Sequence, residues 1–523
     1  MPTTITITAE ELEQLRAQRD AACAERDVLQ GQLRVVTVER DLLQERLRAF
    51  QRKLFAAKSE ARGSAQQDLF FNEAEALAVS RQPAPEATVS VSISAHQRAT
   101  PGRKPLDPAL PREILRHELP AAERVCPHDG ATLVEIGAEI SEQLDIVPQQ
   151  VRVIQHQRIK YACPCCDQGI AVTPARPRII PKGLLTEAAH AWIIVAKYLD
   201  ALPLYRIAAL LRRFGGELSR GTLAAGVVRI GLAVQPMINL LRDHLLEADV
   251  IYGDETHVQV LKESGRAAQT KSYLWVQMNE TGPPVRLFTY LPSRSTVQGA
   301  TLYAGIQPGA ALMSDGYEPY NEIARANQLV HLGCWAHVRR RLIEAQDALP
   351  KAQREAHPTS ALLQRIARLF AIDEQTRAMA PPARTQRRRE QSQPVLEEMQ
   401  ALLLQHLHTV LPQSLFGKAL HYMNAQWPKL IRFVENGAWP LSNNACENAI
   451  RPFVIGRRNW LFSDTVDGAT ASANLYSLVQ TCKVNGVDVY RYLVALFTAL
   501  PHARTADDYE ALLPWRLPVT ADV

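Results

Sequence analysis

A seven-residue repeat of apolar side chains runs through residues 8–60, a stretch that contains no proline. Residues seven apart lie on one side of a helix, because seven residues make almost two helical turns. The first seam consists of Leu15, Ala22, Leu29, Val36, Leu43 and Phe50, and the second of Leu12, Arg19, Arg26, Leu33, Arg40 and Leu47. This pattern predicts a long helix, either a coiled-coil arm for self-association or a single solvated helix.

The remainder of the 523-residue chain is long enough for several domains. Hydrophobic residues make up 46% and charged residues 22%, which excludes a wholly disordered or fibrous chain. The net charge of +5 permits nucleic-acid binding, but a basic surface has to be found locally. No run of 18 or more apolar residues and no signal-like N-terminus occur, so we expect neither a membrane span nor secretion, and a cytoplasmic location.

Composition and hydrophobic period change several times after the N-terminal arm. Residues 61–110 are rich in Pro, Ser, Ala and Gln and predict a linker. Residues 111–181 predict a small β-rich module, in which VRVIQHQRIKYAC alternates like a strand and four of the eight cysteines occur. Residues 182–247 predict helices separated by paired glycines, with Ser219 as an N-cap. That order indicates either a DNA-binding helix-turn-helix or an ordinary helical hairpin.

From residue 248 the hydrophobic period is two, which predicts consecutive strands. Strands are expected in ADVIYGDETHVQVL, KSYLWVQMN, PVRLFTYL and GAALMSDGYEPY, and LVHLGCWAHVRRRLIEA predicts a strand that leads into a helix. A polar helical insertion at about 343–435 interrupts this unit, which we bound at 248–467, and residues 468–523 predict a helical C-terminal domain. The fold class expected from these patterns is multidomain α+β.

Three acidic residues stand beside the expected strands and helices. Asp254 follows an apolar strand start, Asp315 follows a second apolar strand, and Glu447 would project from an early turn of a helix capped by Ser442 or Asn443. Carboxylate oxygens are the ligands that Mg²⁺ and Mn²⁺ prefer, and a pair of such ions about 3.5–4 Å apart serves phosphoryl transfer. A single acid at a strand end is more often a cap or a surface charge, so the surrounding sequence has to carry the argument.

Nine motifs surround these acids and extend over most of the chain. They are LFAAKSE at 54–60, GRKPL at 102–106, LPREILRHELP at 110–120, GAEISEQLDIVPQQVRVIQHQRIKYAC at 137–163, KYLDALPLYR at 197–206, DET at 254–256, SDGYEPY at 314–320, CWAHVRRR at 334–341 and LSNNACENAIRPFVIGRRNWLF at 441–462. Together and in this order, they resemble the transposases of the insertion sequence 66 family, from about residue 50 to 515. The last motif is the most specific, because few other proteins combine N-x-x-E-x-x-x-R-P with G-R-R-N-W.

The resemblance implies a DDE transposase with a ribonuclease-H-like α/β core, whose helical insertion lies between the second and third acids. It implies that Asp254, Asp315 and Glu447 bind Mg²⁺ or Mn²⁺ and catalyse phosphoryl transfer. The chain would bind the terminal inverted repeats of an insertion sequence, cleave there, and transfer the freed strand into target DNA. The alternative is a catalytically silent DNA-binding protein that occupies the element ends as a regulator, although retention of all three acids favours the enzyme.

Partners follow from the same resemblance. They are double-stranded DNA of the element ends and of the target, at least one further copy of the chain, because two ends must be held together, and other small proteins of the element. A bacterial, nucleoid-associated location without a membrane is implied.

The cysteine module departs from the family pattern, in which two Cys-x-x-Cys pairs form a zinc finger. Cys163 and Cys166 supply one pair, but the first pair is CPHD, so Cys126 stands with Asp129 at the second cysteine position. Either His128 or Asp129 completes a zinc site, because zinc accepts nitrogen and oxygen donors, or the site is degenerate and the module folds by its core.

The segment after Glu447 supplies candidate DNA contacts. Arg451 lies four residues further on the same helix face, where it either contacts a phosphate or pairs with Glu447. The cations, amide and indole of GRRNW suit a DNA backbone and a stacked base, or else form a buried Trp flanked by solvated arginines. These candidates are Arg457, Arg458, Asn459 and Trp460.

Two other positions carry expectations. His337 in CWAHVRRR either orients a nucleophile or is an ordinary packed histidine. Gly226 stands where the family usually has Trp, so we expect the pocket of that indole to be repacked, at a cost to helix stability on the order of 1 kcal/mol relative to Ala.

Overall fold

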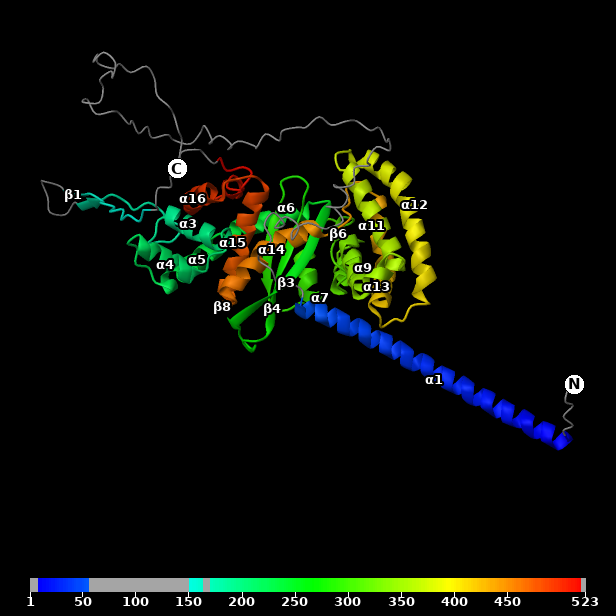
Figure 1. Ribbon diagram of the computed structural model, residues 1–523. Coiled ribbons are helices and arrows are strands. Elements are labelled where there is room, and N and C mark those ends of the chain that lie inside the picture. The colour runs from blue at the N-terminus through cyan, green and yellow to red at the C-terminus, as the bar shows by residue number, and fades with distance from the viewer. Residues whose placement is uncertain (1–7, 56–149, 163–169, 519–523) are drawn as a thin grey trace, which may run out of the picture. The chain divides into compact units, whose positions relative to one another are not determined.

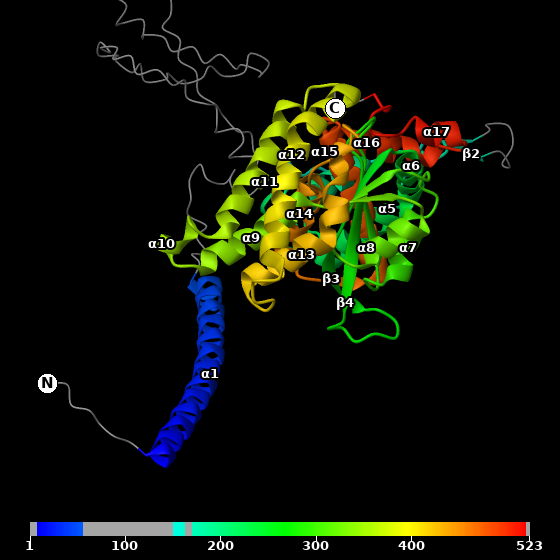
Figure 2. The same ribbon diagram turned by 90° about the vertical axis from the view of Figure 1, so that its right-hand side faces the viewer.

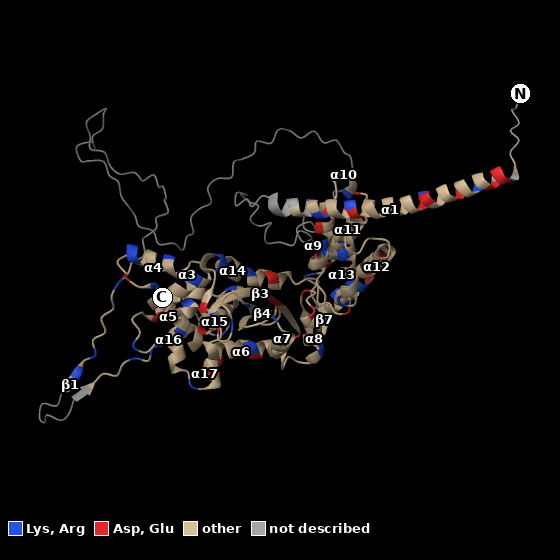
Figure 3. Cartoon of the chain, turned by 90° about the horizontal axis from the view of Figure 1, so that it is seen from below, with Lys and Arg blue, Asp and Glu red and all other residues tan. Residues whose placement is uncertain are grey.

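The computed structural model describes residues 8–55, 150–162 and 170–518 (Figure 1). The helix predicted at the N-terminus is confirmed as α1 (Ala9–Phe55), along which positive and negative residues are interspersed (Figure 3). Leu15, Leu29 and Leu43 of its first seam are each more than half exposed. The helix therefore presents an apolar stripe to the solvent.

A short antiparallel hairpin precedes the helical region. It consists of β1 (Lys160–Ala162) and β2 (Ile170–Val172). The strand predicted over 151–163 is wrong for residues 151–159, which adopt no regular structure. Alternation fits one face of a strand, but a strand also needs a partner for its backbone groups, and β2 is only three residues long. The candidate zinc ligands Cys126, His128, Asp129, Cys163 and Cys166 lie outside the described residues.

The region 182–247 is helical, as predicted. Its helices are α3 (Glu187–Tyr198), α4 (Leu204–Arg213), α5 (Arg220–Ala233) and α6 (Gln235–Leu246). Ser219 is confirmed as the N-cap of α5, because its hydroxyl accepts the N–H of Thr222 at 3.0 Å. None of the described helices is alone long and apolar enough to cross a membrane; α5 and α6 reach that length and composition only as a pair bent by 45°.

A histidine of a neighbouring helix lies beside Gly226, the position at which the family usually has Trp. A Cβ on Gly226 would lie 2.9 Å from Cε1 of His190, so the imidazole of α3 occupies the space beside α5. Burial lowers the pKa of His190 to about 4. The expected repacking therefore takes the form of a neutral buried histidine against a helix glycine.

A mixed sheet forms the centre of the next region (Figure 2). Its strands are β3 (Val250–Lys262), β4 (Lys271–Met278), β5 (Arg286–Leu291), β6 (Ala311–Met313) and β7 (Val330–Leu332), in the order β5-β4-β3-β6-β7. β3, β4 and β5 are an antiparallel meander, whereas β6 and β7 run parallel to β3. The predicted strands are confirmed. The polar strand β8 (Ser463–Thr465), which pairs with the end of β3, was not predicted because SDT lacks hydrophobic alternation.

Helices cover both faces of the sheet because successive residues of a strand point to opposite faces. Val250 and Tyr252 of β3 belong to one buried cluster and Ile251 to another. The second cluster includes α7 (Thr296–Tyr303) and α8 (Pro319–Ala326). The first includes α14 (Asn444–Trp460), α15 (Val466–Val484) and α16 (Val489–Ala499), and α17 (Ala506–Glu510) follows after the short 3-10 turn Leu500–His502. The sheet and these helices belong to one compact unit of the chain.

The polar insertion is helical, as predicted, and has its own core. Its elements are α9 (Trp335–Ala348), α10 (Lys351–Arg354), α11 (Pro358–Gln375), α12 (Pro381–Leu407), α13 (Leu415–Leu430) and the 3-10 turn Arg432–Val434. Trp335, Leu369, Met399 and Leu420 are fully buried within it. α9 begins directly after β7, so the insertion is continuous with the sheet.

Candidate active site

Two neighbouring parallel strands bring Asp254 and Asp315 to the same end of the sheet. Tyr252 of β3 pairs with Met313 of β6, and each aspartate follows its paired residue by two positions. Asp254 is still within β3, whereas Asp315 lies in the loop that leads from β6 to α8. Because the two strands run in the same direction, residues that follow a paired residue by the same number of positions lie next to each other.

Glu447 is brought to this place by the start of α14. Asn443 occupies the N-cap position and Glu447 lies in the first turn of α14, as predicted, but the side chain of Asn443 makes no capping hydrogen bond. Instead, the Asn443 amide donates to the carbonyl of Gly253 at 3.0 Å, and its N–H donates to Sγ of Cys334 at 3.2 Å. The first turn of α14 is thereby joined to β3 at the residue before Asp254.

Asp254 is half-buried and is surrounded by negative charges. Burial raises the pKa of Asp254 well above its usual value, and the carboxylates of Glu255, Asp315 and Glu447 raise it further. A 2.8 Å hydrogen bond from the Glu255 N–H to Oδ1 of Asp254 opposes that shift. Asp315 and Glu447, the other two acids singled out in the sequence, therefore both lie close enough to Asp254 to act on its charge.

Two basic residues of α9 contact Glu447. Nη2 of Arg340 lies 2.9 Å from Oε2 of Glu447, and Nε2 of His337 lies 3.7 Å from Oε1. Burial lowers the pKa of His337, and the charge of Glu447 opposes this shift. Nδ1 of His337 and Oε1 of Glu447 are buried without a hydrogen-bond partner among the described residues. His337 therefore lies beside Glu447, in a position from which it can orient a group at this site.

Within the described residues, no group of three or more His, Cys, Asp or Glu side chains encloses a metal position. The carboxylates are turned toward other partners: Asp254 and Asp315 accept backbone N–H groups, and Glu447 pairs with Arg340. The donor set nevertheless fits a divalent cation. Burial and three neighbouring carboxylates raise the pKa of Asp254, and Oε1 of Glu447 is buried without a hydrogen-bond partner among the described residues, so the site lacks positive charge that Mg²⁺ or Mn²⁺ would supply.

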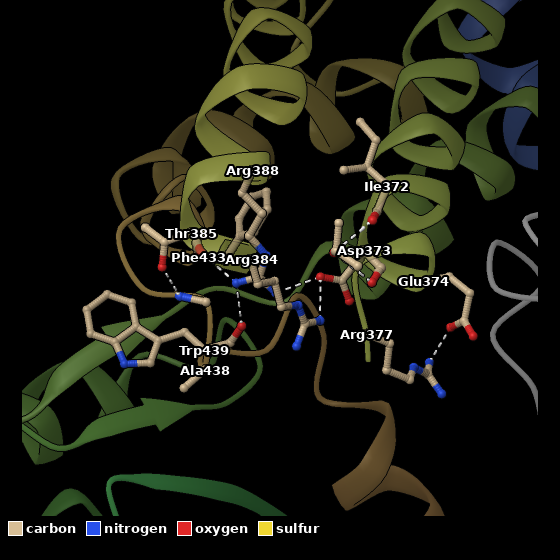
Figure 4. A network of polar contacts seen from close by, with 12 residues as sticks. Ile372, Asp373, Glu374, Arg377, Arg384, Thr385, Arg388, Phe433, Ala438 and Trp439 are labelled. Carbon is tan, nitrogen blue, oxygen red and sulfur yellow. Dashed lines mark hydrogen bonds and ion pairs between the residues drawn. The ribbon is translucent and has the colours of Figure 1, made fainter. Parts of the chain in front are cut away.

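The helical insertion holds the segment that leads to Glu447 (Figure 4). The guanidinium of Arg388 on α12 is fully buried and donates to three backbone carbonyls of that segment. They belong to Phe433, Asn436 and Trp439, at 2.7, 2.9 and 2.9 Å. Asp373 of α11 balances its charge at 2.6 Å. No pattern in RTQRRRE distinguishes Arg388 from its neighbours, so its role was not predictable from the sequence.

A fourth carboxylate was also missed. Glu255 is on β3 next to Asp254, and its side chain is only 1% exposed. The hydroxyl of Tyr320 donates to it at 2.6 Å, and Nε of Arg294 donates at 2.5 Å. Its sequence signal is its place in the DET motif, directly after Asp254.

The arginines predicted to contact DNA differ in their surroundings. Arg451 lies near Glu447, whose charge opposes the lowering of the pKa of Arg451 by burial. Arg457 donates to Oγ1 of Thr256 at 3.3 Å and to the backbone carbonyl of the next residue, so it supports β3. Arg458 is exposed.

Asn459 and Trp460 contact the helical region. The Asn459 amide donates to the carbonyl of Ala201 at 2.8 Å. Nζ of Lys197 lies 3.9 Å from the centroid of the Trp460 ring. Burial lowers the pKa of Lys197 to about 7. In this arrangement the indole is a partly buried packing group, and a role in stacking on a base stays a prediction.

Four family models match the chain. The model described as "Transposase IS66 family" matches residues 182–471, more than half of the chain. The "zinc-finger binding domain of transposase IS66" matches 123–167, the "IS66 C-terminal element" matches 477–515, and the "Transposase C of IS166 homeodomain" matches 42–114.

Relatives in Sinorhizobium fredii are similar over most of their length. The uncharacterized protein y4qI is 32% identical, with 79% of each chain covered. The uncharacterized protein y4jD is 28% identical over 78% of this chain and 81% of its own. The uncharacterized protein y4hP is 28% identical over 89% of this chain and 86% of its own.

Proposed function

We propose that this chain, which belongs to the transposase IS66 family, cleaves DNA at the ends of an insertion sequence and transfers the freed strand into target DNA. Family membership implies a DDE-type, DNA-binding transposase. We assign the catalysis of strand cleavage and transfer to Asp254, Asp315 and Glu447. We also assign the mixed sheet to a ribonuclease-H-like core. The observation that carries this assignment is that the parallel pairing of β3 and β6 brings Asp254 and Asp315 to one end of the sheet, while Asn443 joins the start of α14, four residues before Glu447, to Gly253.

The three carboxylates would hold Mg²⁺ or Mn²⁺, and such an ion would supply the Lewis acidity that phosphodiester cleavage needs. Asp254 provides a half-buried carboxylate on β3. His337 is placed to orient Glu447. Arg340, whose side chain is about half exposed, and Arg451 supply positive charge beside the acids, where a DNA phosphate has to approach.

Exposed arginines of α4 and α5 would bind the terminal inverted repeats. They are Arg206, Arg212, Arg213, Arg220 and Arg229. Binding through phosphates releases counterions, so the logarithm of the affinity should fall linearly with the logarithm of salt concentration. Affinity that does not depend on salt would contradict this assignment.

We assign self-association to the N-terminal arm, because α1 presents an apolar stripe and two DNA ends must be held together. Deletion of residues 1–60 should reduce both the oligomer size and the pairing of ends. An unchanged oligomer with normal end pairing would contradict this role.

The zinc-finger match at 123–167 supports a bound zinc ion, with Cys126, Cys163, Cys166 and either His128 or Asp129 as ligands. Purified protein without zinc by elemental analysis would exclude it.

The decisive experiment is cleavage of a labelled element end in Mg²⁺ or Mn²⁺. Asp254→Asn, Asp315→Asn and Glu447→Gln should each reduce cleavage by at least about 100-fold while end binding persists. The matched control is Asp243→Asn, an exposed aspartate of α6, which should cleave like wild type. Near wild-type cleavage by any of the three variants would refute the assignment.

One observation favours the second candidate, a silent DNA-binding regulator. Oε2 of Glu447, the third acid, is ion-paired with Arg340 at 2.9 Å. A regulator would bind the ends as wild type does, yet would cleave nothing in either metal.

A further inference from the structure

The two aspartates are oriented by backbone donors in a similar way. Oδ1 of Asp254 accepts the N–H of Glu255 at 2.8 Å, and Oδ1 of Asp315 accepts the N–H of Tyr317 at 2.9 Å. A backbone N–H orients the carboxylate that accepts it. The carboxylate can therefore move if the peptide that carries this N–H moves. The contacts that hold Glu255 and Tyr317 therefore also affect the direction in which the carboxylates of Asp254 and Asp315 point.

One arginine contacts both of these residues. Nε and Nη2 of Arg294 each lie 2.5 Å from Oε1 of Glu255. Its guanidinium carbon lies 3.4 Å from the centroid of the Tyr317 ring, and the Tyr317 hydroxyl donates to the Arg294 carbonyl at 3.1 Å. Arg294 thus links β3, the loop after β5 and the loop after β6.

The strength of these contacts follows from burial. The Glu255 side chain is 1% exposed, so its charge cannot be solvated and has to be balanced by a partner within the protein. Tyr320 supplies one neutral hydrogen bond, and Arg294 supplies the positive charge. The guanidinium also stacks on an aromatic ring, a contact that a lysine reproduces only in part.

We propose that Arg294 is a positioning residue, which aligns Asp254 and Asp315 for a divalent cation by holding Glu255 and Tyr317. This inference rests on the proposed function, because it assigns metal binding to the two aspartates. Partners that orient metal ligands typically contribute 10–100-fold to metal affinity. Arg294 should contribute an effect of that order without touching the metal.

The test measures Mn²⁺ binding to the full-length protein by calorimetry, together with its thermal unfolding. Arg294→Gln should weaken Mn²⁺ binding by about 10-fold or more, and Arg294→Lys should have a smaller effect because it keeps the charge. Tyr317→Leu, which removes the stacked ring, should also weaken binding. The matched control is Arg325→Gln, because Arg325 is exposed and ion-paired with Glu322 of the same helix, and its Mn²⁺ affinity should equal that of wild type.

The outcomes separate this inference from the function on which it rests. Wild-type Mn²⁺ affinity in Arg294→Gln and Tyr317→Leu, even with lower thermal stability, would overturn the inference and leave the function intact. Wild-type protein that binds no Mn²⁺, or Asp254→Asn that binds it normally, would overturn both. If Arg294→Gln fails to fold, Arg294→Lys and Tyr317→Leu decide by the same readout.

Discussion

The side-chain amide of Asn443 donates a 3.0 Å hydrogen bond to the backbone carbonyl of Gly253. Asn443 is fully buried, and the two residues are separated by 190 positions in the sequence. The bond joins the helix that carries the third acid to the strand that carries the first. The relative position of the two acids therefore depends on an amide that is not itself acidic.

Asn443→Ala should lower the free energy of unfolding by about 1–3 kcal/mol, because the carbonyl of Gly253 loses its side-chain partner in a buried place. Urea unfolding measures this directly. Asn239→Ala is the matched control: this asparagine is exposed on α6, and its loss should change stability by less than about 0.5 kcal/mol. Equal stability of Asn443→Ala and wild type would contradict a structural role for the amide.

Arg388→Met should lower the free energy of unfolding by about 3–5 kcal/mol, since it removes the fully buried partner of an ion pair and leaves three carbonyls without their donor, while Asp373 keeps only Arg384 at 2.8 Å. The neighbouring Arg387→Met is the control. Arg387 is exposed and lies 3.7 Å from Glu390, so its loss should cost less than about 1 kcal/mol. Similar effects of the two substitutions would mean that the buried network is not what stabilises the insertion.

Gly231→Ala tests the crossing of α5 and α15. An added Cβ would lie 2.5 Å from Cβ of Ala471 and 2.7 Å from its Cα, so one helix has to move. We expect a loss of about 1–3 kcal/mol in thermal or urea unfolding. Gly221→Ala, in the same helix, meets nothing closer than 3.6 Å and should stabilise by up to about 1 kcal/mol. A harmless Gly231→Ala would show that the helices can separate freely.

His331 predicts a dependence of stability on pH. Burial is the main cause that lowers the pKa of His331 from 6.5 to about 3, and the charges of Lys429 and Arg432 add to it. Below pH 6.5 the unfolded chain therefore binds a proton that the folded chain does not, and stability decreases as the pH falls. The slope should reach up to about 1.4 kcal/mol per pH unit.

The measurement is urea unfolding of wild type and His331→Gln between pH 7.5 and 4.5. The raised pKa of Asp254 acts in the opposite direction but is common to both proteins, so it cancels in the comparison. The variant should lose stability less steeply in acid. Identical slopes would mean that the imidazole accepts its proton without unfolding the chain.

The hydrophobic patterns were sufficient to predict most of the helices and strands. Alternation predicted β3, β4 and β5, the seven-residue repeat predicted α1, and Ser219 marked the start of α5. The same reasoning failed over residues 151–159 and at β8, where a strand depends on whether a partner is present rather than on its own pattern.

The sequence by itself determined the period of each segment, the family to which the motifs belong, and the acids worth testing, because these are local properties of neighbouring residues. The tertiary structure alone decided which basic residues are buried and which face the solvent. It made Arg388 and Arg294 internal partners of Asp373 and Glu255, although nothing in their surrounding sequence differs from that of an exposed arginine. Burial depends on contacts between distant segments, and in a buried place an unpaired charge is too costly to leave without its partner.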